Sequence, residues 1–306
     1  MRNNKILVIV GGPEHKVDSF REEAKTLNIN LEIASFYDLS YDTTGTKYVL
    51  RVKERDLKEF GLVYIRVVGK RLEEATLLVN YLKKSSVKIV DRVYNESILL
   101  PSTISKAFEM VKLKNADIPI PPTYFSSLAN IRQKAGKILG FPFVIKSTSG
   151  KKARDVWAPE TDRELSELIG SLRKREIQGD SFFAQKLIKS SKRSRILVVD
   201  GKAIAGVARS TKFRKRFQEK VGGEYPEKLK ETIYPVPDLL AKLSVDAAAA
   251  AGLDISGIDI LHEEDTEELY VIEANAAPPW KLIKENTIVN VEAEILRFLQ
   301  KRLNES

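Results

Sequence analysis

The sequence predicts a fold that combines the α/β and α+β classes, with an open α/β sheet at the N-terminus. Over the first hundred residues, short apolar runs alternate with stretches of helical periodicity, which is typical of an open α/β sheet. Later in the chain, pairs of apolar runs are joined by short polar turns, which indicates antiparallel hairpins. We therefore expect an N-terminal α/β domain over residues 1–100 and a second region over 101–306.

The N-terminal region contains four apolar runs and two amphipathic stretches. We expect strands at Lys5–Val10, Leu31–Phe36, Leu62–Val68 and Val87–Val90, and helices at Val17–Leu27 and Leu72–Leu82. Gly11 and Gly12 follow the first strand, but the GxGxxG spacing of a dinucleotide fingerprint is absent. The glycine pair therefore does not predict a Rossmann cofactor site.

The middle of the chain, about 117–187, predicts a small α+β module. The proline-rich stretch Ile118–Thr123 is expected to be extended and to mark a boundary. We expect helices at Ser102–Ala116, Leu128–Leu139 and Arg163–Arg175, and strands at Phe143–Lys146, Val156–Ala158 and Ser181–Leu187. Asp162 is expected to cap the helix that begins at Arg163.

The C-terminal part predicts two hairpins and two helices. The first hairpin pairs Ile196–Val199 with Ala203–Ala208 and has the type I′ turn signal Asp200-Gly201 at its tip. We expect a basic loop at Arg209–Gly223, a helix at Pro237–Ala251 that ends at Gly252, and a closing helix at Ile288–Leu303.

Composition excludes several kinds of site. The chain has no cysteine, so disulfides, thiolate catalysis and cysteine-based metal sites are excluded. His15 and His262 are the only histidines and lie far apart in sequence, which argues against a zinc site or a histidine-based triad. No apolar run approaches the roughly 20 residues that span a bilayer. We expect a cytoplasmic protein with no membrane partner.

The formal net charge of +9 favours polyanionic partners. Two stretches, Lys186–Arg195 and Arg209–Arg216, each hold five basic residues and no acidic one. They either bind an anionic substrate such as a glutamate-rich peptide or form a solvated basic surface, and both alternatives stay open. Phe213 is the only aromatic residue within them, so a nucleic-acid partner is the least favoured interpretation.

The second hairpin carries the strongest signal for chemistry. Its strands, Ile255–Leu261 and Leu269–Ala274, flank a polar turn. A hairpin centred on Thr266 places Asp259 across from Glu273, and Asn275 shares a face with Glu273. Two carboxylates that lie this near each other on an apolar surface repel each other. A hard cation such as magnesium removes the free-energy cost of that repulsion. The alternative is a solvated hairpin with polar residues on its outer face.

Two further features are, by themselves, weak evidence for nucleotide binding. Lys146 ends an apolar strand beside a Ser-Thr-Ser-Gly loop, where a lysine can hold phosphate, although a strand-end lysine that reaches for solvent is more common. The stretch Ala184–Ile188 passes from a strand to a polar segment, and such a hinge can pair an adenine edge through its backbone.

Taken together, these parts resemble the ATP-grasp superfamily, in particular the RimK-like branch of ribosomal-protein glutamate ligases. The resemblance covers the chain in order and is firmest from Lys106 to Pro278. Its matching pieces are Ser105-Lys106 with Met110, Ile118–Thr123, Phe143–Lys146, Gln185–Ile188, Arg195 before Ile196–Val199, Phe213-Arg214, Gly257–Leu261 and Glu273–Ala276. Each piece is weak alone, but eight in the right order are a strong signal.

The resemblance implies an ATP-grasp fold behind an N-terminal pre-ATP-grasp domain. Within residues 101–306 it implies a lid subdomain at about 117–187 and a metal- and phosphate-binding subdomain at about 188–306. It also implies the family's chemistry: a carboxylate attacks the γ-phosphate of ATP to give an acylphosphate, and an amine then displaces phosphate to form an amide.

Carried over by position, the resemblance implies a role for each matching residue. The nucleotide would be held by Lys106, Lys146, Gly150, Lys151, Gln185, Lys186, Leu187 and Ile188. Asp259, Glu273 and Asn275 would hold one or two magnesium ions, with manganese as a second candidate. Arg214 and Arg195 would stabilise charge on the transferring phosphoryl group. The partners would be ATP, an unidentified carboxylate and an amine, with an acidic peptide or protein as one candidate and a homo-oligomer left open.

The chain also departs from the family pattern at three places. The loop Ser147–Asp155 has the single glycine Gly150, a basic Arg193 replaces an acidic residue before Arg195, and Ala277-Pro278-Pro279 replaces Ser-Pro-Gly after Asn275. These departures keep open a rival interpretation, in which the chain binds ATP but serves as a regulatory or scaffold protein.

Overall fold

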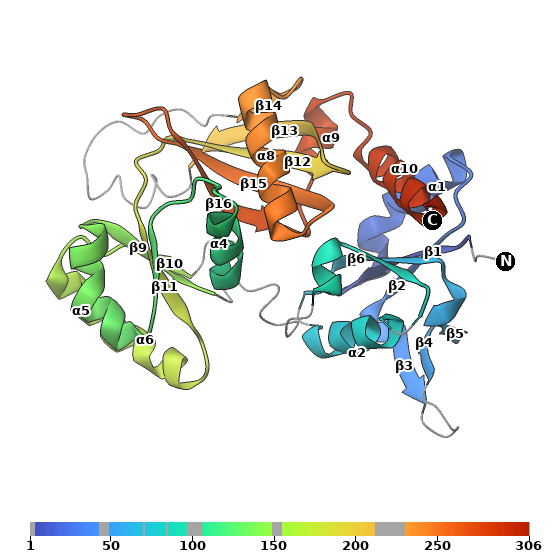
Figure 1. The fold of residues 1–306 in the computed structure, drawn as a ribbon, viewed down its shortest axis with the longest axis horizontal. Coiled ribbons are helices and arrows are strands. Elements are labelled where there is room, and N and C mark those ends of the chain that lie inside the picture. The colour runs from blue at the N-terminus through green and yellow to red at the C-terminus, as the bar shows by residue number, and fades with distance from the viewer. Residues whose placement is uncertain are drawn as a thin grey trace.

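The computed structural model describes residues 4–42, 49–69, 71–83, 85–96, 106–148, 155–211 and 230–305. Within these ranges the strands form four sheets (Figure 1). No helix in the described part of the chain is both long and apolar enough to cross a membrane.

The N-terminal sheet is parallel and has the strand order β2-β1-β6-β7. Its elements are β1 (Ile6–Val10), β2 (Leu31–Ser35), β6 (Leu62–Val67) and β7 (Lys88–Val90), with helices α1 (Asp18–Thr26) and α2 (Leu72–Leu82). Every residue of β1 is buried, because Ile6 and Val8 pack toward α1 while Leu7 and Ile9 pack toward α2. A strand covered on both faces needs a continuous apolar run, and the predicted open α/β sheet is confirmed.

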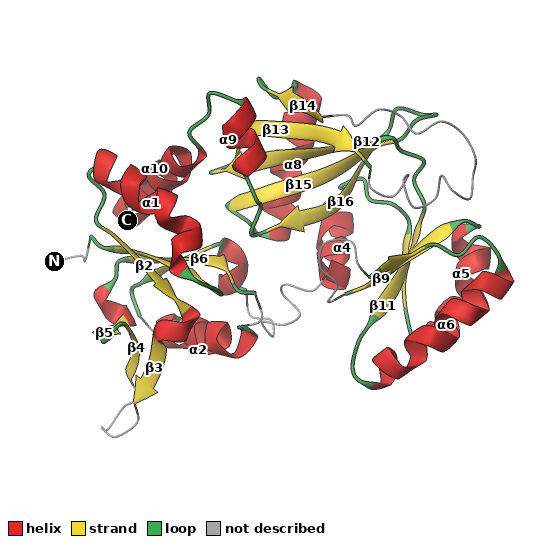
Figure 2. Cartoon of the chain, turned by 180° about the vertical axis from the view of Figure 1, so that it is seen from behind, coloured by secondary structure: helices red, strands yellow, loops and turns green. Residues whose placement is uncertain are grey.

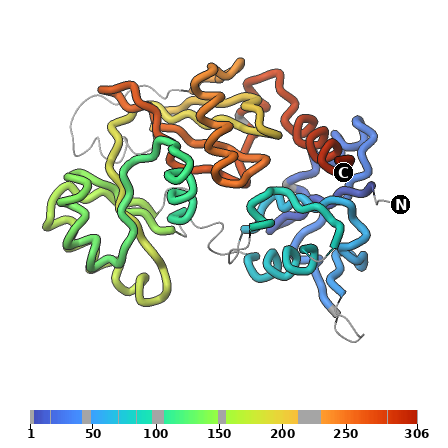
Figure 3. Tube along the Cα trace, in the orientation of Figure 1, coloured from blue at the N-terminus to red at the C-terminus, as the bar shows by residue number. Residues whose placement is uncertain are grey.

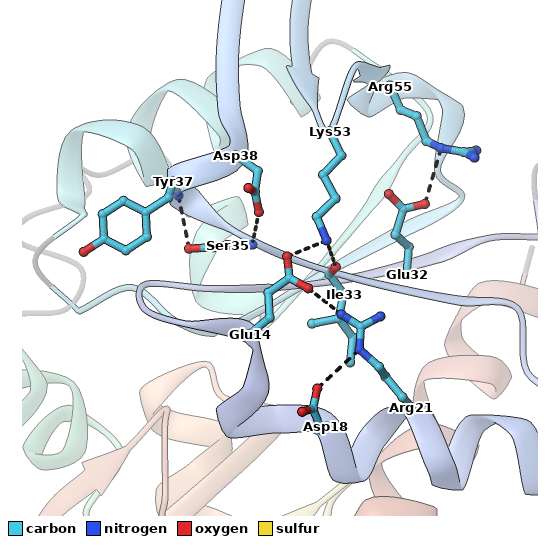
Figure 4. A network of polar contacts seen from close by, with 10 residues as sticks. All are labelled: Glu14, Asp18, Arg21, Glu32, Ile33, Ser35, Tyr37, Asp38, Lys53 and Arg55. Carbon is cyan, nitrogen blue, oxygen red and sulfur yellow. Dashed lines mark hydrogen bonds and ion pairs between the residues drawn. The ribbon is translucent and has the colours of Figure 1, made fainter.

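A small antiparallel sheet beside it was not predicted. It contains β3 (Leu39–Asp42), β4 (Val49–Val52) and β5 (Arg55–Asp56). Figure 4 shows how polar contacts join it to the parallel sheet: Glu14 pairs with both Arg21 and Lys53, and Lys53 Nζ donates to the Ile33 carbonyl at 2.8 Å. These contacts come from side chains far apart in sequence, and the strands themselves are short, so periodicity alone could not reveal them.

The middle sheet is antiparallel, with the order β10-β9-β11-β8, and two helices cover one of its faces (Figure 2). Its elements are β8 (Thr123–Phe125), β9 (Phe143–Ser147), β10 (Val156–Trp157), β11 (Phe182–Lys186), α5 (Leu128–Leu139) and α6 (Asp162–Ile177). The expected cap at Asp162 is wrong. Thr161 is the N-cap residue, since its side chain accepts a hydrogen bond from the Glu164 amide, and Asp162 is the first helical residue.

The largest sheet has the order β14-β13-β12-β15-β16. Its elements are β12 (Lys192–Val199), β13 (Lys202–Ser210), β14 (Lys230–Ile233), β15 (Ile255–His262), β16 (Leu269–Asn275), and the helices α4 (Lys106–Asn115) and α8 (Asp238–Ala251) beside it. Asp200 and Gly201 both have positive φ, as a type I′ turn requires, and Gly252 ends α8 in the left-handed conformation.

Alternation along the strands of this sheet separates two faces. Ile196 and Val198 of β12 pack toward α8, whereas Leu197 and Val199 pack toward the opposite side with α10 (Val291–Asn304). The helix α9 (Lys281–Asn286) also lies on that opposite side (Figure 2). The face opposite α8 is therefore the one that carries the odd-numbered residues of β12.

The last helix returns to the beginning of the chain. α10 lies beside α1, and its Leu296 and Leu299 share a core with Phe20 (Figures 1 and 3). The closing helix was predicted, but the separate helix α9 was not. Four short 3₁₀ helices complete the described elements: Glu14–Val17, Phe36–Asp38, Leu57–Glu59 and Arg92–Asn95. The domain limits at residues 100 and 187 stay predictions.

Candidate active site

The β15–β16 hairpin has the predicted pairing at its carboxylates, although its register shifts by one residue between Asp259 and Ile260, so that pairs nearer the turn, such as His262 with Leu269, are not centred on Thr266. Asp259 pairs with Glu273, and Gly257 pairs with Asn275. The Asp259 side chain is completely buried, whereas 29% of the Glu273 side chain is exposed. Asn275 Nδ2 lies 3.4 Å from the Gly257 carbonyl oxygen. The hairpin therefore presents one buried and one accessible carboxylate, with an amide beside them.

The buried carboxylate is already bound by an arginine from the neighbouring strand. Arg195 pairs with Asp259 across β12 and β15, and its guanidinium donates from Nε to Oδ1 at 2.6 Å and from Nη2 to Oδ2 at 2.7 Å. Arg193 Nη1 lies 3.7 Å from the same Oδ2. Burial lowers the pKa of Arg195, but its hydrogen bonds to Asp259 and the carboxylate charge raise this pKa overall. Arg195 is therefore firmly a cation.

The helix α4 approaches the accessible carboxylate from the other side. Lys106 Nζ lies 3.2 Å from Glu273 Oε1, and one turn later Glu109 Oε1 accepts a hydrogen bond from the Ala274 amide at 2.8 Å. Burial raises the pKa of Glu109 to about 8, and the Glu273 charge adds to this rise. The i, i+3 spacing directs both side chains of α4 toward β16. Sequence reasoning missed Glu109, and its only signal was that spacing from Lys106.

Lys146 reaches the site from the middle sheet. Its Nζ donates to Gln185 Oε1 at 2.6 Å, so the side chain is engaged within the protein. Burial lowers the pKa of Lys146 to about 8; the Glu273 carboxylate opposes that shift and the Lys106 ammonium adds to it. Gln185, which binds Lys146, also lies 3.8 Å from the Met110 sulfur of α4, the helix whose Lys106 pairs with Glu273, so three separate parts of the chain meet here.

The residues expected to line the adenine hinge differ in exposure. Gln185 is 1% exposed, and its Nε2 also donates to Thr123 Oγ1 at 2.9 Å. Ile188 is buried, Leu187 is partly buried and Lys186 is exposed. The Gln185 side chain thus orients Lys146, while a role of this segment in adenine binding stays a prediction.

Three predicted site residues, Gly150, Lys151 and Arg214, lie outside the described residues. Their expected roles stay predictions. The basic loop expected at Arg209–Gly223 begins later than predicted, because Arg209 and Ser210 belong to β13, and residues 212–223 lie outside the described residues.

The donor atoms of the hairpin suit a hard cation in chemical type. Among the described residues, no group of three or more His, Cys, Asp or Glu side chains is arranged to hold a metal ion. Glu273 and Asn275 offer oxygen ligands of the kind that magnesium prefers. Both oxygens of Asp259 are bound by Arg195, so Asp259 can act as a ligand only after that arginine moves. Asp259, Glu273 and Asn275 therefore fit a magnesium ion, on the condition that Arg195 moves away from Asp259.

Comparison with known proteins places this site in a family. Residues 105–299 match the family model described as the RimK-like ATP-grasp domain. The human N-acetylaspartylglutamate synthase A is 24% identical over 271 residues, which cover 84% of this chain and 64% of the human protein. A probable alpha-L-glutamate ligase of Psychromonas ingrahamii is 23% identical over 290 residues, which cover 92% of this chain and 90% of the ligase.

Solved structures show the same fold. The ATP-grasp ligase PsnB in complex with a minimal precursor superposes with a TM-score of 0.71 at 17% identity, covering 99% of this chain and 100% of PsnB. The D-cycloserine synthetase DcsG superposes with a TM-score of 0.69 at 14% identity, covering 98% of this chain and 99% of DcsG. The predicted ATP-grasp fold is confirmed. The chain belongs to the RimK-like ATP-grasp family.

Proposed function

We propose that this chain uses ATP and a divalent cation to join an amine to an acidic carboxylate substrate through an acylphosphate. One observation carries the proposal: a row of charged side chains crosses one face of the largest sheet. Arg195 binds Asp259, Asp259 faces Glu273 on the next strand, and Glu273 pairs with Lys106 of α4. Such a row of fixed charges suits phosphoryl transfer, which needs electrostatic stabilisation more than covalent help from the protein.

In this proposal, the two lysines hold the phosphates of ATP. Lys146 is prepared for this, because its ammonium is partly desolvated and oriented by Gln185. An ammonium in such surroundings gains more from a phosphate than one in water does. The segment Gln185–Ile188 would hold the adenine, and Gly150 and Lys151 would lie over the phosphates.

Glu273 and Asn275, with Asp259 after Arg195 moves, would hold magnesium, or manganese as a second candidate. A bound ion of this kind offsets the negative charge of the phosphates. Arg195, once released from Asp259, and Arg214 would stabilise the charge on the phosphoryl group that is being transferred.

The proposed reaction has two steps. A carboxylate oxygen of the substrate attacks the γ-phosphorus, and ADP leaves. The amine nitrogen then attacks the acyl carbon, phosphate leaves, and the nitrogen loses a proton. The names of relatives support an acidic substrate, since they include an N-acetylaspartylglutamate synthase and alpha-L-glutamate ligases. Structures of PsnB hold precursor peptides, which makes an acidic peptide a candidate alongside an amino acid. The homo-oligomeric state and the cytoplasmic location stay predictions from the sequence.

A second candidate function is an ATP-binding protein with little turnover. The observation that favours it is the ion pair between Arg195 and Asp259, which occupies a proposed metal ligand. Such a protein would bind ATP without transferring its phosphoryl group.

Two measurements test the proposal. Titration calorimetry with magnesium-ATP should show binding, and a screen of acids and amines for ATP-dependent phosphate release should find a pair that is turned over. Glu273→Gln should lower turnover by about 10²-fold or more, because it removes a charge that positions the ion. Glu268→Gln, an exposed change on the same hairpin, is the matched control. Binding without turnover for any pair would favour the second candidate, and absence of ATP binding at millimolar concentration would remove both.

A further inference from the structure

A small basic pocket lies at the end of the charged row that is farther from Lys106. It has a volume of about 100 Å³. Its cationic lining comes from Arg193 and Arg195 of β12, Arg209 of β13 and Lys281 at the start of α9, and its apolar walls include Val207 and Ile283. A water molecule occupies about 30 Å³ in the liquid, so the pocket has room for a carboxylate or phosphate group with a short apolar stem.

The charges of the pocket are not balanced among the described residues. Arg193 and Arg209 are directly opposite each other on adjacent antiparallel strands, an arrangement that is destabilising for like charges. Burial lowers the pKa of Arg209, and the charges of Arg193 and Arg195 lower it further. The carboxylate of Asp259 is the nearby negative charge that both arginines of β12 share, since Arg195 binds its two oxygens and Arg193 lies 3.7 Å from one of them, and Lys281 pairs with Glu285 at 3.5 Å. An incoming anion would relieve the repulsion that remains.

The position of the pocket separates it from the proposed nucleotide site. Along the sheet, Arg209 pairs with Arg193 across β13 and β12, Arg195 pairs with Asp259 across β12 and β15, and Asp259 pairs with Glu273 of β16. Lys106 and Lys146, the proposed phosphate ligands, lie at the Glu273 end. Arg195 therefore stands between a site for phosphates and a second site for an anion.

We propose that this pocket binds a second, non-reacting carboxylate of the acid substrate, and that the substrate is therefore a dicarboxylate or polycarboxylate. The inference rests on the proposed function, because the first carboxylate must reach the phosphate on the Glu273 side of Arg195. Arg193 and Arg209 hold the second carboxylate, and Val207 and Ile283 contact the methylene groups beside it. A monocarboxylate leaves the arginine repulsion in place and binds weakly.

The test uses glutarate and pentanoate, two five-carbon acids that differ by one carboxylate. Each is titrated calorimetrically into the full chain saturated with magnesium-ADP. Glutarate should bind at least tenfold more tightly than pentanoate. Arg209→Gln should weaken glutarate about tenfold to a hundredfold, the usual effect of losing a charge-assisted hydrogen bond, and should leave pentanoate unchanged. Arg193→Gln provides a second variant should the first one fold poorly.

Lys192→Gln is the matched control, because Lys192 lies on the same strand but pairs with Glu231. It removes the same charge and should leave the glutarate affinity unchanged. Equal affinities for the two acids, or equal losses in Arg209→Gln and Lys192→Gln, would overturn the proposal. A loss of magnesium-ADP affinity in Arg209→Gln would overturn it too, since the pocket would then serve nucleotide phosphate. Failure of the wild-type chain to bind magnesium-ADP is a separate result, which counts against the proposed function itself.

Discussion

Arg195 donates hydrogen bonds to both carboxylate oxygens of Asp259, at 2.6 and 2.7 Å, although Asp259 is the buried member of the proposed metal site. In the proposed metal site, the arginine and a cation would therefore compete for the same two oxygens. If a cation took Asp259, the guanidinium would become available to the transferring phosphoryl group or to the basic pocket beside it. Binding of the ion and binding of an anion next to Arg195 are then linked, and each should favour the other.

Arg195→Lys should weaken this competition. A lysine keeps the charge but cannot make the two parallel hydrogen bonds. The free energy of unfolding without metal should fall by roughly 1.5–3 kcal/mol, the range for lost hydrogen bonds to a charged group. Manganese affinity without nucleotide should rise, and electron paramagnetic resonance can measure it. A manganese affinity equal to that of the wild type would show that Arg195 does not compete for Asp259.

Lys146→Met should separate phosphate binding from adenosine binding. Methionine fills a similar volume but removes the ammonium that Gln185 orients. The affinity for ATP should fall about tenfold to a hundredfold, while adenosine should bind within about twofold of the wild type. Calorimetry with both ligands measures the difference, and the exposed Lys137→Met is the control for loss of one surface charge. An equal loss for ATP and adenosine would assign Lys146 to the shape of the site and not to the phosphates.

Local patterns predicted much of this fold. The helices α2 and α5 have the predicted limits, because each has a clear apolar stripe. The pairing of Asp259 with Glu273 was also predicted, but the register near the turn was not: Ile260 pairs with Val271, and a one-residue shift between Asp259 and Ile260 restores the predicted pair. The pattern of apolar and polar residues identified the hairpin, but it did not reveal this irregularity.

The partners of those residues could not be predicted in the same way. Arg195 is 64 residues from Asp259 in sequence, and no periodicity reports that β12 lies next to β15. Glu109 was missed because its role depends on how α4 packs against β16. The ion pair that occupies Asp259 and the buried carboxyl near Glu273 are both consequences of tertiary packing between separate segments.

Arg66→Met should loosen the loop that follows Asn275. Arg66 is 7% exposed, its Nη2 donates to the Pro278 carbonyl at 2.8 Å, and its guanidinium lies 4.1 Å from the centroid of the Trp280 ring. The protein should stay folded, because an apolar side chain can replace a buried cation that is incompletely paired. The loop should lose its anchor, and Trp280 should become more accessible to a fluorescence quencher.

Trp157→Phe makes that measurement specific, since the chain has two tryptophans. In this background, acrylamide quenching reports Trp280 alone. We expect quenching to increase by about twofold in Arg66→Met, as for a side chain that changes from buried to partly exposed. Unchanged quenching would show that Pro278 and Trp280 are held by packing alone.

Asp91→Asn should change how stability depends on pH. Asp91 is completely buried, its Oδ1 accepts hydrogen bonds from the Asp254 and Ile255 amides, and its Oδ2 has no hydrogen-bond partner. Burial raises the pKa of Asp91 from 3.8 to about 8.

Between these two pH values the folded protein holds a proton that the unfolded chain releases, so the free energy of unfolding contributed by Asp91 falls as pH rises from about 4 to about 8. Asparagine keeps the Oδ1 acceptor and cannot ionise, so the variant should lack this decline. Urea unfolding at intervals from pH 5 to pH 8.5 measures the free energy of unfolding of both proteins. The value for the variant relative to that of the wild type should increase with each step in pH. Asp246→Asn, which removes a partly exposed carboxylate paired with Lys242, controls for the loss of one negative charge. Curves for Asp91→Asn and the wild type that stay parallel would mean that Asp91 is ionised in the folded protein throughout this range.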